Sequence, residues 1–141
     1  MIIDDKNILT ASGTALTATA SSDVFDTDGL GDIGISCNPL WIYAVVQTAL
    51  TSSGSTTLTV TFETSTDNST FTTVVSTAAI PKATLVEGYN ILNMPLPVGC
   101  NRYVRLTYTV ATGPFTGGTV FAAIMPSGTR LDRYYPDNIP V

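Results

Sequence analysis

The sequence contains no histidine, the side chain that most often moves protons near neutral pH. Neither a Ser–His–Asp nor a Cys–His arrangement can form, and an imidazole metal site is excluded. Glutamate occurs only at Glu63 and Glu87. A pair of carboxylates is the minimum for glycoside hydrolysis, but Glu63 stands among threonines and Glu87 beside Gly88 in an expected bend. We expect two solvated carboxylates and no enzyme activity.

Charge is also scarce. Charged residues make up 12% of the chain, about half of the usual ~25%, whereas 44% of the residues are hydrophobic. Much of the surface must therefore be threonine, serine, glycine and apolar side chains, which protect weakly against association. This favours a protein that works inside an assembly. The formal charge of −5 argues against nucleic-acid binding, which needs clustered lysine and arginine.

Cysteines and long apolar runs are few as well. A single disulfide between Cys37 and Cys100 is possible, but two cysteines this far apart in sequence do not make a disulfide framework. No neighbouring base would activate either thiol. We expect two buried or half-buried thiols. No run approaches the ~18 apolar residues of a membrane span, and the first residues lack the pattern of a signal peptide. We therefore expect a protein made in a reducing cytoplasm, with no membrane partner.

The clearest pattern that is present lies between residues 102 and 110. Apolar and polar residues alternate there: Val104, Leu106, Tyr108 and Val110 against Tyr103, Arg105, Thr107 and Thr109. Period-two alternation of β-branched and aromatic residues predicts a strand with one buried face. The polar face offers hydroxyls and a guanidinium but no carboxylate, so we expect it to pack or bind.

Further short segments have strand character, and turn residues separate them. They are residues 14–20, 40–46, 57–63, 71–77, 82–97 with a bulge or bend near Gly88, and 119–125. The continuous apolar run 40–46 predicts a strand buried on both faces, and 57–77 predicts a hairpin. No window has helical periodicity.

This pattern predicts an all-β, single-domain antiparallel β-sandwich. A jelly roll of about eight strands is our first choice, and an immunoglobulin-like sandwich is the alternative. We divide the chain into an N-terminal arm (1–10), a jelly-roll domain (11–126) and an extended C-terminal tail (127–141).

Two segments superficially suggest a ligand. Residues 26–32 interleave aspartates with glycines as a calcium loop does, but Leu30 stands where a ligand is needed and the distal glutamate is missing. We interpret the segment as a turn and expect no metal and no cofactor. Trp41 and Tyr43 could form a stacking platform, but within an apolar run they are more typical of a core.

The tail carries arginine, tyrosine and proline, the first two of which anchor many protein interfaces. It is either a disordered end or an arm that docks on a neighbour. We favour the arm, because Arg130, Arg133, Tyr134 and Tyr135 are unlike the composition of a disordered tail.

Taken together, residues 1–5, 76–80, 102–110 and 115–118 resemble the cement, or decoration, proteins of short-tailed bacteriophage capsids. The resemblance is spread over most of residues 1–124. It implies a small jelly roll on the outer surface of an icosahedral shell, bound across the seams between major capsid proteins. It also implies a homo-oligomer, with a dimer favoured and a trimer possible.

We expect partner contacts from three places in the chain. They are the arm (Ile2, Ile3 and Asp4), the tail (Arg130, Arg133, Tyr134 and Tyr135), and the polar strand face (Tyr103 and Arg105). The alternative function is that of a carbohydrate-binding β-sandwich on a virion, because residues 64–71 resemble turns of such modules.

Overall fold

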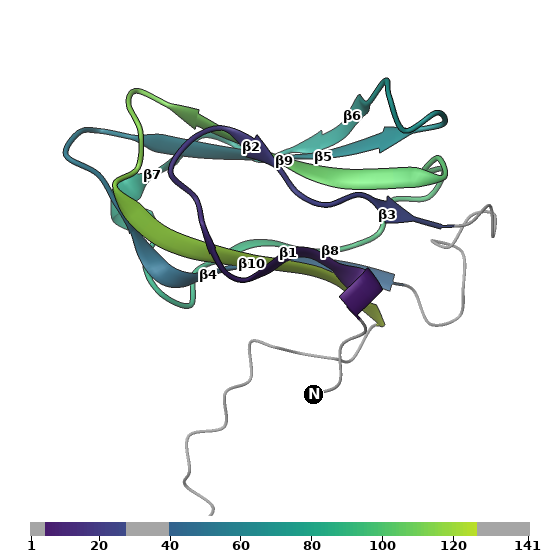
Figure 1. Ribbon diagram of the computed structural model, residues 1–141, viewed down its shortest axis with the longest axis horizontal. Helices are drawn as coiled ribbons and strands as arrows, with labels where there is room; N and C mark the ends of the chain where they lie inside the picture. Colours follow the sequence, from purple (N-terminus) through teal and green to yellow (C-terminus); the bar gives the residue numbers. More distant parts are fainter. Residues whose placement is uncertain (1–4, 28–39, 127–141) are drawn as a thin grey trace, which may run out of the picture.

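The computed structural model describes residues 5–27 and 40–126, which form two antiparallel β-sheets packed face to face (Figure 1). The strands are β1 (Ile8–Ala15), β2 (Ala20–Ser21), β3 (Phe25–Asp26), β4 (Leu40–Thr51), β5 (Thr57–Ser65), β6 (Thr72–Ser76), β7 (Ile80–Pro81), β8 (Asn90–Pro95), β9 (Tyr103–Ala111) and β10 (Gly117–Pro126). Two single 3-10 turns, η1 (Asp5–Asn7) and η2 (Lys82–Thr84), complete the described elements, which include no α-helix.

One sheet has four strands in the order β1-β10-β4-β8. The other has six, with β2-β9-β5-β6 in order, β3 paired with β9 and β7 paired with β5. Since β2 and β3 both pair with β9, and β6 and β7 both pair with β5, each couple acts as one interrupted strand, which leaves eight.

The connectivity is that of a long hairpin wound around itself. Its tip is the hairpin β5–β6, and towards the chain ends β4 pairs with β8, β2 with β9, and β1 with β10. The two sheets thereby share these pairs alternately, which is the arrangement of a jelly roll. The eight-stranded jelly roll expected from the sequence is confirmed.

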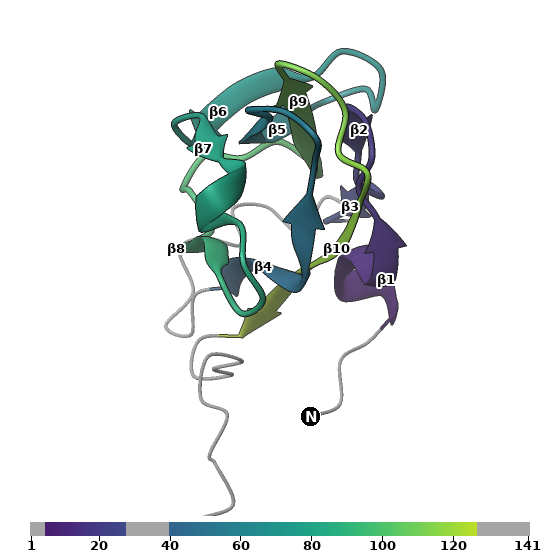
Figure 2. The ribbon, with the colours of Figure 1, turned by 90° about the vertical axis from the view of Figure 1, so that its left-hand side faces the viewer.

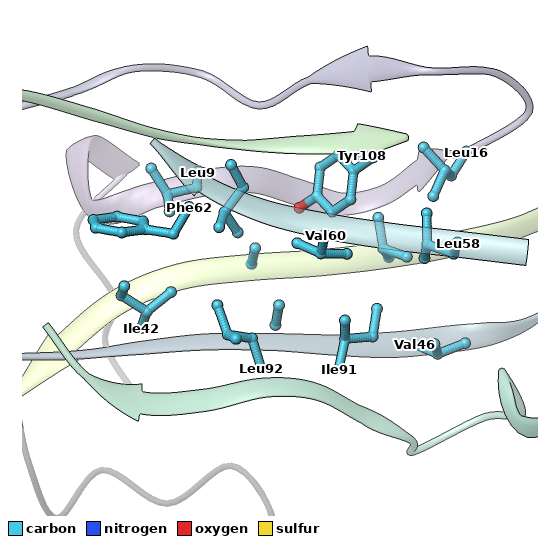
Figure 3. Packing of buried hydrophobic residues seen from close by; sticks show 14 of the residues in the cluster. Leu9, Leu16, Ile42, Val46, Leu58, Val60, Phe62, Ile91, Leu92 and Tyr108 are labelled. Carbon is cyan, nitrogen blue, oxygen red and sulfur yellow. The ribbon is translucent and has the colours of Figure 1, made fainter. Parts of the chain in front are cut away.

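The core lies between the sheets and is built from alternating positions (Figure 3). From β5 it takes Leu58, Val60 and Phe62, each at most 1% exposed, and burial of such a side chain stabilises the fold by roughly 1.5–3 kcal/mol. From β9, Val104, Leu106 and Tyr108 are buried in the same core. In β4, Ile42 faces the core, while Tyr43 is buried on the other side of the sheet. The prediction of a strand buried on both faces is therefore confirmed.

The strand predicted at residues 14–20 is wrong. Strand β1 ends at Ala15, and the chain then crosses to the other sheet, where β2 begins at Ala20. The alternation of threonine and alanine imitated a strand, whereas Leu16, 3% exposed, fills the core at the crossing. Residues 8–10, which we assigned to the arm, already belong to β1, and Leu9 is fully buried.

The strand predicted at 82–97 is confirmed only in its second half. Residues 82–84 form η2, Gly88 adopts a positive φ of 80° in a turn, and β8 follows from Asn90. The expected bend is therefore a turn ahead of the strand. Glycine suits this turn because residues with a side chain rarely adopt a positive φ.

The remaining expectations concern cysteines, metals and membranes. Cys100 is half-buried, and its Sγ lies 2.9 Å from the carbonyl oxygen of Pro97; Cys37 lies outside the described residues. In the described part of the chain no group of acidic or cysteine side chains could hold a metal ion. The same residues include no helix that could span a membrane.

Candidate interaction surface

The centre of the six-stranded sheet carries an ion pair on its outer face. The pairing of β5 with β9 places Glu63 opposite Arg105, and Nε of Arg105 donates to Oε2 of Glu63 at 2.8 Å. Thr107 donates its hydroxyl to the same oxygen at 2.9 Å. The side chains of Arg105 and Glu63 are 27% and 15% exposed. One carboxylate thus fixes two polar side chains of β9.

The ring of Phe71 completes this cluster. It lies just before β6, and its centroid is 3.8 Å from the guanidinium carbon of Arg105, a geometry that stabilises a cation by ~0.5–1 kcal/mol or more. Within the described residues, the terminal nitrogens of Arg105 donate to no acceptor. Because the side chain is held by Glu63 and Phe71, it would lose little entropy on binding a partner. Four residues make up what we call the Arg105 cluster: Glu63, Phe71, Arg105 and Thr107.

The turn between β5 and β6 holds Phe71 in place. Oδ1 of Asp67 accepts hydrogen bonds from the backbone N–H groups of Thr70 at 2.8 Å and Ser69 at 2.9 Å, and from the Ser65 hydroxyl at 2.8 Å. These bonds lower the pKa of Asp67 to about 2. Asn68 adopts a positive φ of 55°, which asparagine tolerates well. Oδ1 of this carboxylate is therefore committed within the turn.

A second polar group lies at one end of β9. Asp26, on β3, pairs in register with Tyr103 and binds Arg102 through two bonds, from Nε to Oδ1 at 2.7 Å and from Nη2 to Oδ2 at 2.8 Å. The Arg102 guanidinium carbon lies 5.0 Å from the centre of the Tyr103 ring. Both charged side chains are more than 40% exposed, so the pair adds little stability.

The structure places two of the sequence-predicted contact residues together. Tyr103 and Arg105 lie on the same outer face of β9, two positions apart. The other seven lie outside the described residues: Ile2, Ile3, Asp4, Arg130, Arg133, Tyr134 and Tyr135. Tyr43 is 5% exposed and packs in an apolar cluster, so it offers no open stacking platform.

Sequence reasoning missed the partners of these residues. Glu63 was interpreted as a solvated carboxylate, Asp26 was considered only as the first residue of a calcium-like turn, and Phe71 was not singled out. Only the strand register brings Glu63 opposite Arg105, because 42 positions separate them in sequence. The available signal was the presence of one acid and one base on the polar faces of two adjacent predicted strands, since opposite charges pair across strands.

Comparison with known proteins assigns the chain to a protein family. Residues 10–124 match the family model Bbp16, a segment that runs from β1 to β10 and includes the Arg105 cluster. No curated protein matches the chain. The match covers well over half of the sequence, and the chain therefore belongs to the Bbp16 family of bacteriophage proteins.

Proposed function

We propose that this protein is a capsid cement, or decoration, protein. It binds the outer surface of the icosahedral shell made by the major capsid protein and bridges neighbouring subunits there. The single observation that supports this best is the Arg105 cluster, a pre-ordered cation on a threonine-rich sheet face. Membership of a bacteriophage family and the jelly-roll sandwich agree with such a role.

The outer face of the six-stranded sheet suits binding to a large flat partner. Strand β5 contributes Thr57, Thr59 and Thr61 at half-buried positions, and β9 adds Thr107 and Thr109. A hydroxyl can both donate and accept a hydrogen bond, so these threonines can pair with either kind of group on a partner. Few charged side chains of this face would have to lose water when a partner binds. Arginine is one of the residue types that most often anchor protein interfaces. Its terminal N–H groups suit a carboxylate or a backbone carbonyl of the shell.

The mechanism is thermodynamic linkage. A protein that binds the assembled, expanded shell and not the free subunits stabilises the shell against heat and internal pressure. Many copies act on one particle, and a homo-oligomer engages two sites at once. Modest affinity at each contact therefore becomes strong retention. In this proposal the arm and the tail, with Ile2, Ile3, Asp4, Arg130, Arg133, Tyr134 and Tyr135, add contacts to the shell or to a sister subunit.

Cosedimentation with expanded shells that lack this protein tests the proposal. The intact chain is expected to saturate the shells, and Arg105→Ala is expected to bind at least about ten-fold more weakly, as hot-spot residues do. Thr84→Ala, an exposed change in η2 outside both sheets, is the matched control. If the intact chain stays in the supernatant, the proposal is wrong. If Arg105→Ala binds as tightly as the intact chain, the contact lies elsewhere.

A further inference from the structure

A cavity of about 140 Å³ opens between the two sheets, on the side of the sandwich where β1 and β2 lie (Figure 2). Each of these strands stands at the edge of its sheet. At one end of the cavity the chain crosses between the sheets, after Ala15. At the other end the backbone N–H of Asp23 donates to the carbonyl oxygen of Leu9 at 2.8 Å. Backbone therefore frames the cavity at both ends.

Small side chains leave this space open. The two sheets of a sandwich lie ~10 Å apart, and large side chains normally fill the gap at high density. Several of the residues that line the cavity are small: Ala11, Thr14, Ala15, Ala20, Ser21 and Ser22. The alternation of threonine and alanine at residues 14–20, which imitated a strand, thus leaves room between the sheets.

The inner part of the cavity is apolar apart from two hydroxyl groups. Leu9, Leu16 and Val120 line it and are each at most 3% exposed. The ring of Tyr108 lies between Leu9 and Leu16 (Figure 3), and its hydroxyl oxygen is 2.8 Å from Oγ1 of Thr10. Tyr108 is 2% exposed and Thr10 is 6% exposed, so both hydroxyl groups belong to buried residues.

This pair of hydroxyls has one hydrogen-bond donor to spare. Two hydroxyls carry two protons, and the bond between Thr10 and Tyr108 uses one of them. Within the described residues neither oxygen has another partner. A buried donor without an acceptor is unfavourable, so the second proton favours an occupant of the cavity that brings an acceptor atom.

Size and charge define the class of occupant further. A cavity of about 150 Å³ can hold a benzene ring. Among the described residues that line the cavity only Asp23 is charged, and it is exposed, so an ion would be buried without a partner, at a high cost. A sugar would place several hydroxyls against apolar side chains, which is also unfavourable. A neutral ring with one oxygen acceptor fits these conditions.

We propose that this cavity binds a small neutral molecule made of one apolar six-membered ring with an oxygen acceptor, such as a cyclic ketone. The ring packs against Leu9, Leu16 and Val120, and the oxygen accepts the spare hydrogen bond of Thr10 and Tyr108. The inference is independent of the proposed function, because the Arg105 cluster lies on the outer face of one sheet and the cavity lies between the two. A ligand that binds only the folded chain also stabilises it.

Methyl NMR with cyclohexanone as the probe tests the site. Cyclohexanone is expected to shift the methyl signals of Leu9, Leu16 and Val120 in a saturable way. The signals of Val98, which is 67% exposed elsewhere on the surface, should stay unchanged. If cyclohexanone gives no saturable shift of the lining methyl groups, the cavity holds water only and the proposal is wrong.

Replacing both hydroxyls tests the hydrogen bond. The double variant Thr10→Val/Tyr108→Phe keeps the shapes of the side chains, and removing both partners of one bond can be nearly neutral for folding. The Kd of cyclohexanone should rise at least about five-fold, which corresponds to one hydrogen bond. The Kd of toluene, a ring of similar size without an oxygen, should not rise. Equal changes for the two probes would overturn the proposal.

Filling the cavity gives a test that leaves the hydroxyls in place. Ala20 pairs with Tyr108 across β2 and β9, and residues paired in this way project from the same face of a sheet. The larger side chain of Ala20→Leu should therefore enter the cavity and abolish the binding of both probes. Ala79→Leu, the same change at an exposed alanine between β6 and β7, should bind as the unaltered chain does. Binding that survives in Ala20→Leu would contradict the proposed site.

Discussion

Arg105 and Glu63 face each other across β9 and β5, with the guanidinium Nε 2.8 Å from the carboxylate Oε2. The two residues lie 42 positions apart in the sequence, so the bond forms only when both central strands of the six-stranded sheet are in register. The same contact orders the cation that we propose as an anchor for the shell. The stability of the sheet and the geometry of the candidate interface are therefore connected through one pair of side chains.

Replacing Glu63 tests this connection. Glu63→Ala removes the acceptor of both Arg105 and Thr107, and we expect the free energy of unfolding to fall by about 1–2 kcal/mol. Glu87→Ala, at an exposed position, is the matched control and should change stability by less than ~0.5 kcal/mol. Urea denaturation measures both. Adding Arg105→Ala to Glu63→Ala should cost less than the sum of the single changes, and strict additivity would show that the pair is not coupled.

Gly118 tests the close packing at the start of β10. A Cβ at this position would lie 2.6 Å from Cα of Leu50 and 2.7 Å from the carbonyl oxygen of Ala49, and φ is +110°. Gly118→Ala is expected to destabilise the fold by roughly 3 kcal/mol or more, because backbone atoms must move. At Gly99, φ is +84° and an added Cβ would meet no atom within 4 Å, so Gly99→Ala isolates the backbone strain, which costs ~1–2 kcal/mol. Equal thermal unfolding temperatures for the two alanine variants would contradict this account.

Tyr108 gives the fold a characteristic behaviour at high pH. Burial raises the pKa of Tyr108 to about 12, against the opposing effect of its hydrogen bond with Thr10. Below pH ~10 the phenol is neutral in both the folded and the unfolded state, and its full contribution to the free energy of unfolding is present. Between about pH 10 and 12 the unfolded chain ionises first, so stability should fall by up to ~2–3 kcal/mol.

Tyrosinate absorbance and unfolding measured along the same alkaline titration check this prediction. Tyr108→Phe should remove this high-pKa tyrosine from the titration and make stability less dependent on pH in this range. Tyr103→Phe, at a half-buried surface position, should leave the alkaline loss of stability in place. A Tyr108→Phe protein with an unchanged alkaline profile would rule out Tyr108 as the source.

Asp67 gives the opposite dependence at low pH. The pKa of Asp67 is about 2, below the ordinary 3.8, because three hydrogen bonds stabilise the carboxylate. The contribution of this carboxylate to the stability of the fold is therefore complete above pH ~4 and is lost as the pH falls towards 2. Asp67→Asn retains an oxygen acceptor for the turn but cannot titrate, and its stability should fall less over this range. Identical acid unfolding of the two proteins would show that the turn does not depend on this charge.

The sequence predicts those parts of the fold in which local pattern and burial agree. The alternation in β5 and β9 and the apolar run of β4 each predict strands whose buried faces are correct. Residues 14–20 fail because small alternating residues give the same signal whether the chain lies in a sheet or crosses between two sheets. Leu16, the one large apolar residue there, fills the core at the crossing.

The candidate site is less accessible to sequence reasoning. Arg105 and Tyr103 follow from the polar side of one strand, but the partners Glu63 and Phe71 depend on the register between strands, which no local pattern contains. The second buried side of β4, on which Tyr43 lies, was hidden for a related reason. A run that is apolar on both sides, such as residues 40–46, shows that two faces are buried but not what buries the second one.

The copy number of this protein in purified, DNA-filled particles tests the central claim most directly. Quantitative staining of a gel would compare its 14.8 kDa band with that of the major capsid protein. We predict a copy number close to that of the major capsid protein, because a cement protein occupies sites repeated over the whole shell. A few copies per particle, or none, would contradict the proposed role.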